Sequence, residues 1–148
     1  MKKNIILLIA GIILSVLFIA FSTPLMESLY YEREFSMDFY NQSLYGLVAT
    51  IDVAIAWAFA GLFYYVINSV SFSRWYHWLI MLALAAFLSA VAGYVYPNSL
   101  FVEQGLDYSV QLFRFALVNA LLAAIVMVVA SFAMRWWSSN CRHTPIPE

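Results

Sequence analysis

Residues 77–96, HWLIMLALAAFLSAVAGYVY, contain no Asp, Glu, Lys or Arg. A helix rises about 1.5 Å per residue and needs roughly 20 consecutive apolar residues to cross the hydrocarbon of a bilayer. Three further apolar runs lie at about residues 4–21, 44–67 and 113–134, and the only charges within them are Asp52 and Arg114. The sequence therefore predicts an all-α, polytopic membrane protein with four transmembrane helices in one bundle.

The composition of the whole chain agrees with this class. Of its 148 residues, 65% are hydrophobic and 10% are charged, whereas a soluble domain is nearer half apolar and a quarter charged. An ordinary soluble globule is therefore excluded, and disorder is excluded because 18% of the residues are aromatic. One cysteine, Cys141, cannot form an internal disulfide or a cysteine-built metal cluster. We treat residues 1–148 as a single membrane domain.

The first apolar run has a competing interpretation as a secretory signal peptide, because Lys2 and Lys3 precede it. However, the run is longer than the usual apolar core of a signal peptide. The residues that follow it, Ser22-Thr23-Pro24, offer no typical cleavage site, because proline disfavours cleavage there. We therefore expect a retained transmembrane helix.

Basic residues set the expected orientation, because Lys and Arg accumulate in the cytoplasmic loops of membrane proteins. With the N-terminus inside, the inner loop at residues 68–76 and the tail at 135–148 face the cytoplasm. Five of the seven basic residues then lie inside: Lys2, Lys3, Arg74, Arg135 and Arg142. Six of the eight acids lie in the outer segments: Glu27, Glu32, Glu34, Asp38, Glu103 and Asp107. Glu148 belongs to the inner tail. We expect a multi-pass protein of a bacterial-type inner (plasma) membrane, with both termini cytoplasmic.

The two segments predicted outside the membrane differ in character. Residues 22–43 contain Pro24, which favours the first turn of a helix, followed by apolar residues at roughly helical spacing. Two interpretations of this segment are open: an amphipathic helix that lies on the membrane surface or caps the bundle, and a solvated loop. Residues 97–112 begin with Pro97-Asn98-Ser99, which predicts a turn.

Asp52 is a candidate functional residue, because an ionisable side chain inside a span is expensive to bury. Asp52 and Asn119 are each 15 positions from the inner ends of their predicted helices, so both lie about 22 Å from the cytoplasmic interface. Ser15 and Ser89 come within roughly two turns of the same depth on the other two helices. The sequence therefore predicts an intramembrane polar layer to which each helix contributes one group.

Two interpretations of this layer stay open. In one, Asp52 is a proton or cation site in a pathway. In the other, Asp52 is protonated, or is held by Asn119 and hydroxyl groups, and fixes helix packing. An ion pair between Asp52 and Arg114 is a further alternative, although helical phase places Arg114 on a different face from Asn119.

The sequence carries no motif that is typical of an enzyme. The sequence has no phosphate-binding loop, zinc-binding helix, nucleophile elbow or C-x-x-C pair, so we predict no catalytic residue, metal or cofactor. Beyond the lipid bilayer, we expect another membrane protein or a second copy of the chain as partner, and no nucleic acid. The expected partner surface comprises Tyr30, Tyr31, Phe35, Phe39 and Tyr40.

Two functions from different classes remain. The first is a non-enzymatic protein that acts through helix contacts, as an accessory or assembly subunit or as an immunity-type protein. The alternative is a small homo-oligomeric channel or transporter with Asp52 and Asn119 along its path.

Overall fold

The computed structural model describes residues 1–146, and within them it contains helices and no strand. Four helical segments are long and apolar enough to cross a membrane, as the sequence predicted. They are α1 (Lys2–Ala20), α4 (Leu44–Gly61) with its π-helical extension η1 (Leu62–Ile67), α5 (Trp75–Glu103) and α6 (Ser109–Met134). The remaining elements are short: α2 (Ser22–Leu29), α3 (Arg33–Asn41), η2 (Val70–Phe72) and η3 (Arg135–Trp137).

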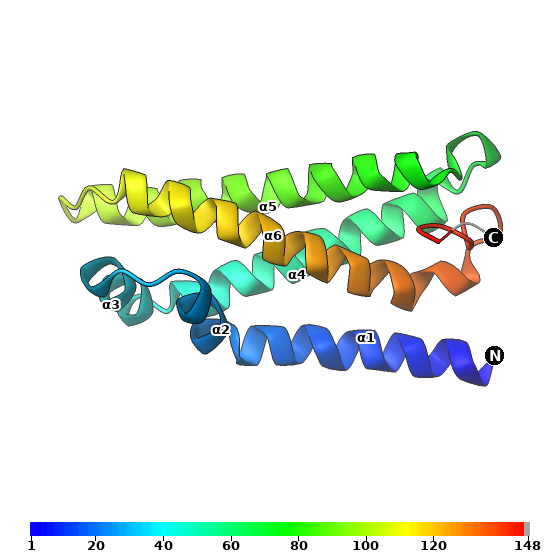
Figure 1. Cartoon of the computed structure of the whole chain (residues 1–148), viewed down its shortest axis with the longest axis horizontal. Coiled ribbons are helices and arrows are strands. Elements are labelled where there is room, and N and C mark those ends of the chain that lie inside the picture. Colours follow the sequence, from blue (N-terminus) through cyan, green and yellow to red (C-terminus); the bar gives the residue numbers. More distant parts are fainter. Residues whose placement is uncertain (147–148) are drawn as a thin grey trace.

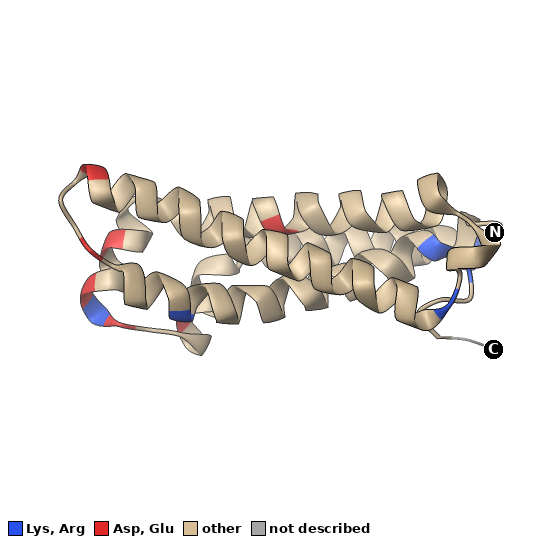
Figure 2. Cartoon of the chain, turned by 90° about the horizontal axis from the view of Figure 1, so that it is seen from above, with Lys and Arg blue, Asp and Glu red and all other residues tan. Residues whose placement is uncertain are grey.

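The long helices lie side by side, and the chain termini lie at the same end of the bundle (Figure 1). We call this the terminal end. The opposite end carries α2, α3 and the connection at 104–108 between α5 and α6, and we call it the acidic end. Acidic residues gather there, whereas basic residues gather mainly at the terminal end (Figure 2). Glu148 lies outside the described residues.

Aromatic side chains from four helices pack together at the acidic end. The ring of Phe39 in α3 lies 4.6 Å from that of Tyr45 in α4 and 4.8 Å from that of Phe115 in α6, between ring centroids. Phe35 joins the same cluster and lies 6.3 Å from Phe101 in α5. Because these rings bury large apolar areas, they hold α3 firmly against the bundle.

This packing decides the structure of residues 22–43. The segment forms α2 and α3, so the solvated-loop interpretation is wrong. It also corrects the expected partner surface, because Phe35 and Phe39 are fully buried in the protein's own core. Tyr30 is half-buried, whereas Tyr31 and Tyr40 are each 60% exposed. Of the residues predicted as partner surface, these last two are the most accessible.

Helix α5 continues through Pro97, so the turn predicted at Pro97-Asn98-Ser99 is wrong. Proline removes one helical hydrogen bond. However, Pro97 is buried in the bundle, and Phe101, one turn later, is fully buried in the aromatic cluster. Tertiary packing of the two side chains therefore outweighs the local preference. Both α5 and α6 extend beyond the spans predicted at 77–96 and 113–134.

The end of α5 is set by Gly105, whose φ of 75° lies in the left-handed region that glycine adopts without steric strain. The N–H of Gly105 donates to the carbonyl of Val102, and the N–H of Leu106 donates to the carbonyl of Phe101. These two bonds form a Schellman motif, which satisfies the last carbonyls of the helix and turns the chain towards α6.

Helix α1 docks on the bundle through small residues. Gly11 and Ser15 are its buried positions, and the long apolar side chains around them are exposed. A Cβ atom on Gly11 would lie 2.5 Å from the Cβ of Ala133 in α6, closer than real Cβ contacts. Trp57 in α4 donates its indole N–H to the Ser15 hydroxyl at 2.9 Å. The contact therefore depends on the absence of a side chain at Gly11.

We expect Gly11→Val to destabilise the protein by about 1–3 kcal/mol, because the added atoms overpack the α1–α6 contact. Thermal unfolding in detergent, followed by circular dichroism, measures the loss. Gly46→Val is the matched control, because a Cβ at Gly46 meets nothing within 4 Å. Equal losses in the two variants would show that helix propensity, and not the close approach of α1, sets the effect.

Candidate functional site

The polar residues Asp52 and Asn119 meet in the interior of the bundle. Both are 0% exposed. The side-chain amide of Asn119 in α6 donates to Asp52 Oδ1 in α4 at 3.1 Å, and to the backbone carbonyl of Ser89 in α5 at 3.3 Å. One amide therefore links three of the four long helices.

Small neighbours make this meeting possible. Ala49 and Ala56, which flank Asp52 on its face of α4, are buried, and so is Gly93 in α5. A Cβ atom on Gly93 would lie 3.0 Å from the Asn119 amide nitrogen, so α5 can approach that amide closely because position 93 has no side chain. Such small residues let apolar helices pack near one another.

Several polar atoms of this centre have no hydrogen-bond partner among residues 1–146: Asp52 Oδ2, Asn119 Oδ1 and the hydroxyl of Ser89. An ionised carboxylate only accepts hydrogen bonds, whereas a carboxylic acid also donates one. A neutral carboxylic acid at Asp52 therefore has nearby oxygens to which it can donate a hydrogen bond. An ionised carboxylate has no proton to donate to them. The centre can act as an internal cross-link without opening to solvent.

Ser15, from the predicted polar layer, and Arg114, the alternative ion-pair partner of Asp52, both lie apart from this centre. The hydroxyl of Ser15 donates to the Gly11 carbonyl at 2.8 Å and belongs to the α1–α4 contact with Trp57. Arg114 is exposed at the acidic end and acts electrostatically on Tyr30 and Glu32. Within the described part of the chain it forms no ion pair with Asp52, whose carboxylate is bonded to Asn119.

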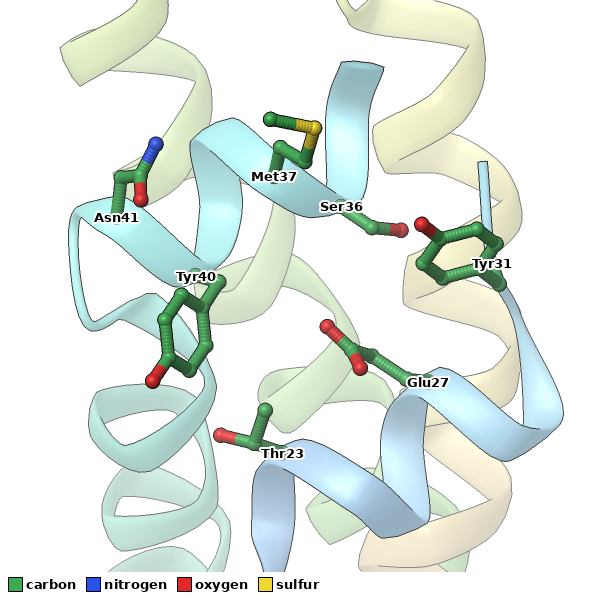
Figure 3. Close-up of a pocket in the computed structure, with 7 residues that line it drawn as sticks. All are labelled: Thr23, Glu27, Tyr31, Ser36, Met37, Tyr40 and Asn41. Carbon is green, nitrogen blue, oxygen red and sulfur yellow. The ribbon is translucent and has the colours of Figure 1, made fainter. Parts of the chain in front are cut away.

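A second candidate site is a groove at the acidic end, made of two adjoining cavities of about 360 and 450 Å³. The cavities share Thr23 of α2 with Tyr40 and Asn41 of α3. The first is also lined by Glu27, Tyr31, Ser36 and Met37 (Figure 3). The second continues onto the end of α1 and the start of α4, and is also lined by Ile19, Ala20, Ser22, Ser43, Tyr45 and Gly46.

Sequence reasoning did not identify this groove. Glu27 counted only as one of the outer acids, and Thr23 and Asn41 carried no recognisable motif. The signal was the helical spacing of apolar residues within residues 22–43. The position of α3 relative to α2 depends in addition on the packing of Phe35 and Phe39 against α4, α5 and α6.

Hydrogen bonds around the starts of α3 and α6 hold the acidic end together. Glu32 accepts from the side-chain amide of Gln111 at 3.1 Å and from the hydroxyl of Tyr30 at 3.0 Å. These two donors lower the pKa of Glu32. Tyr108 donates its hydroxyl to Asp38 Oδ2 at 2.5 Å, and this bond raises the pKa of Tyr108 to about 12.

The lowered pKa of Glu32 gives an expected pH dependence. Because the folded pKa lies below the ordinary value of 4.5, this contribution to stability is present above that value and is lost as the pH falls through the folded pKa. We expect Glu32→Gln to lose less stability than the wild type between about pH 5 and pH 3. Thermal unfolding across that range measures this. Glu103→Gln, at an exposed position, is the control and should follow the wild type.

Comparison of the chain with protein-family models, with curated proteins and with solved structures finds no match in any of the three. The polar centre and the groove are therefore the features of the chain that indicate its function.

Proposed function

We propose that the protein is a non-enzymatic, multi-pass protein of a bacterial-type inner membrane that acts through contacts with other proteins, as an accessory or assembly subunit or as an immunity-type protein. The observation that carries this proposal is the complete burial of Asp52 and Asn119, which are bonded to each other between α4 and α6. A polar layer that is closed within the chain serves packing. The function then belongs to the outer surfaces of the bundle.

Charge supports an orientation for this protein. Basic residues are concentrated at the terminal end and acidic residues at the acidic end (Figure 2). Because Lys and Arg favour the cytoplasmic side, we place both termini in the cytoplasm, and α2 and α3 on the outer face.

Exposed aromatic residues on α3 and just before it form the surface that we assign to a partner. Tyr31 and Tyr40 are each 60% exposed, and Met37 between them is also exposed. Tyrosine and methionine are enriched in protein interfaces, and tyrosine buries a large area there at low entropic cost. Residues of this kind at the rim of the bundle suit a partner that is itself embedded in the membrane.

A photo-cross-linking experiment in native membranes tests this assignment. A benzophenone amino acid at position 40 should give a discrete adduct with another protein or with a second copy. The same probe at position 87 is the control, because Phe87 is an exposed apolar residue in the middle of α5. Identical labelling from both positions, or a monomer that keeps no partner after extraction in mild detergent, would contradict the proposal.

The alternative function, a small homo-oligomeric channel or transporter, requires Asp52 and Asn119 to line a path. In one chain both side chains are 0% exposed. We therefore expect liposomes that contain the purified protein to show no more ion flux than empty liposomes. Flux that appears with the wild type and disappears with a folded Asp52→Asn variant would overturn the proposal in favour of the channel.

A further inference from the structure

The groove at the acidic end has the chemistry of a cation site. The carboxylate of Glu27 points from α2 into the space between the side chains of Tyr40 and Tyr31, and the hydroxyls of Tyr31 and Ser36 lie on the same side of it (Figure 3). Aromatic faces attract ammonium groups, and hydroxyl and carboxylate oxygens accept hydrogen bonds from the ammonium N–H groups. A cavity of about 360 Å³ falls within the range of small-molecule sites.

The negative charge in the groove is not balanced by the protein. Within the described residues, Glu27 forms no hydrogen bond or ion pair, and neither cavity is lined by Lys or Arg. Glu27 is half-buried, so its charge is only partly screened by water. An anionic ligand would be repelled here, whereas a positively charged group would supply the missing partner.

The adjoining cavity indicates which kind of molecule carries the positively charged group. It extends from the shared residues Tyr40 and Asn41 to Ile19 and Ala20, at the end of the apolar helix α1. Tyr45, at the start of α4, also lines this cavity and is 1% exposed. Apolar helices that cross a bilayer end at the level of the lipid headgroups, so the groove lies at that level.

We propose that this groove binds the ammonium group of a zwitterionic aminophospholipid of the phosphatidylethanolamine class. Glu27 pairs with the ammonium, and the rings of Tyr31 and Tyr40 pack against it. The inference depends on the membrane placement proposed above. Tyr31 and Tyr40 also belong to the proposed partner surface, so a lipid headgroup in the groove would form part of that surface.

The test uses the full chain in nanodiscs that contain phosphatidylethanolamine and phosphatidylglycerol in equal amounts, and native mass spectrometry identifies the lipids retained on release. We expect at least a fivefold preference for phosphatidylethanolamine in the wild type. Glu27→Gln should bring the ratio close to one, and Tyr40→Leu should reduce it. The control Glu103→Gln removes the same charge at the same end of the bundle, but outside the groove, and should keep the preference. A wild type without preference, or a Glu27→Gln variant that retains it, would overturn the proposal.

Two further measurements separate the alternatives. Ethanolamine added to nanodiscs of pure phosphatidylglycerol should not bind as tightly as the lipid does, and equal affinity would overturn the lipid as the source of the ammonium. Extraction of native membranes with alkaline carbonate tests the membrane placement itself. If the chain is removed by carbonate, the placement fails. If the chain is retained but shows no lipid preference, only the lipid inference fails.

Discussion

Replacing Asn119 with leucine should lower the free energy of unfolding by about 1–3 kcal/mol, because it leaves the buried carboxyl of Asp52 without its hydrogen-bond donor. Asp52→Asn should be tolerated. The new amide keeps an oxygen that accepts from Asn119, and its N–H₂ group can donate to Asn119 Oδ1 or to the Ser89 hydroxyl, both unpartnered in the structure. The double variant Asp52→Leu/Asn119→Leu should recover much of the loss, since removing both partners leaves neither of the two side chains with an unsatisfied polar group.

Thermal or denaturant unfolding in detergent of the wild type, both single leucine variants and the double variant gives the coupling energy between the two residues. A positive coupling together with a stable Asp52→Asn variant supports an architectural polar centre. The opposite pattern, in which Asn119→Leu is harmless and Asp52→Asn unfolds the protein, would mean that the centre requires an ionised carboxylate. That result would favour the pathway interpretation over the packing interpretation.

The fold was largely predictable because the length of the apolar runs and the composition of the chain determine it. Apolar runs of the length of a bilayer gave the four long helices, and the second run matches the observed span, Leu44–Ile67. The prediction failed where tertiary contacts override local preference. Pro97 signals a turn by itself, yet it is buried within a continuous helix because Phe101 beyond it packs into the aromatic cluster.

The polar centre was predictable only in part. Counting residues along a helix gives depth, and depth places Asp52 and Asn119 at the same level. Depth does not give the direction in which a side chain points around the helix axis. The hydroxyl of Ser15 therefore meets Trp57 instead of Asp52. The groove around Glu27 was not predictable, because its shape depends on the relative positions of α2 and α3. Residues outside both cavities, such as Phe35 and Phe39, determine these positions.

At the terminal end, Asn68 holds the C-terminal tail against the connection between α4 and α5. Its φ of 30° is in the left-handed region, which asparagine tolerates better than most residues. Its side-chain oxygen accepts from the hydroxyl of Ser138 at 2.8 Å and from the backbone N–H of Asn140 at 3.0 Å, while its amide donates to Ser139 at 2.8 Å. Cys141 follows these residues and is 1% exposed.

Asn68→Ala should loosen this tail, because it removes three side-chain hydrogen bonds and places alanine at a strained φ. Two bonds remain, from the Tyr64 hydroxyl to the Thr144 carbonyl and from the Asn140 side chain to the backbone carbonyl of residue 68. Burial raises the pKa of the Cys141 thiol, so in the docked tail the thiol is both covered and protonated, and it should react slowly with maleimide at neutral pH. We expect the Asn68→Ala variant to react several times faster, since a loosened tail exposes the thiol more often and moves its pKa towards the ordinary value. Asn41→Ala, at the opposite end of the bundle, is the control. A labelling rate that is fast in the wild type, or unchanged in Asn68→Ala, would show that the tail is not held by Asn68.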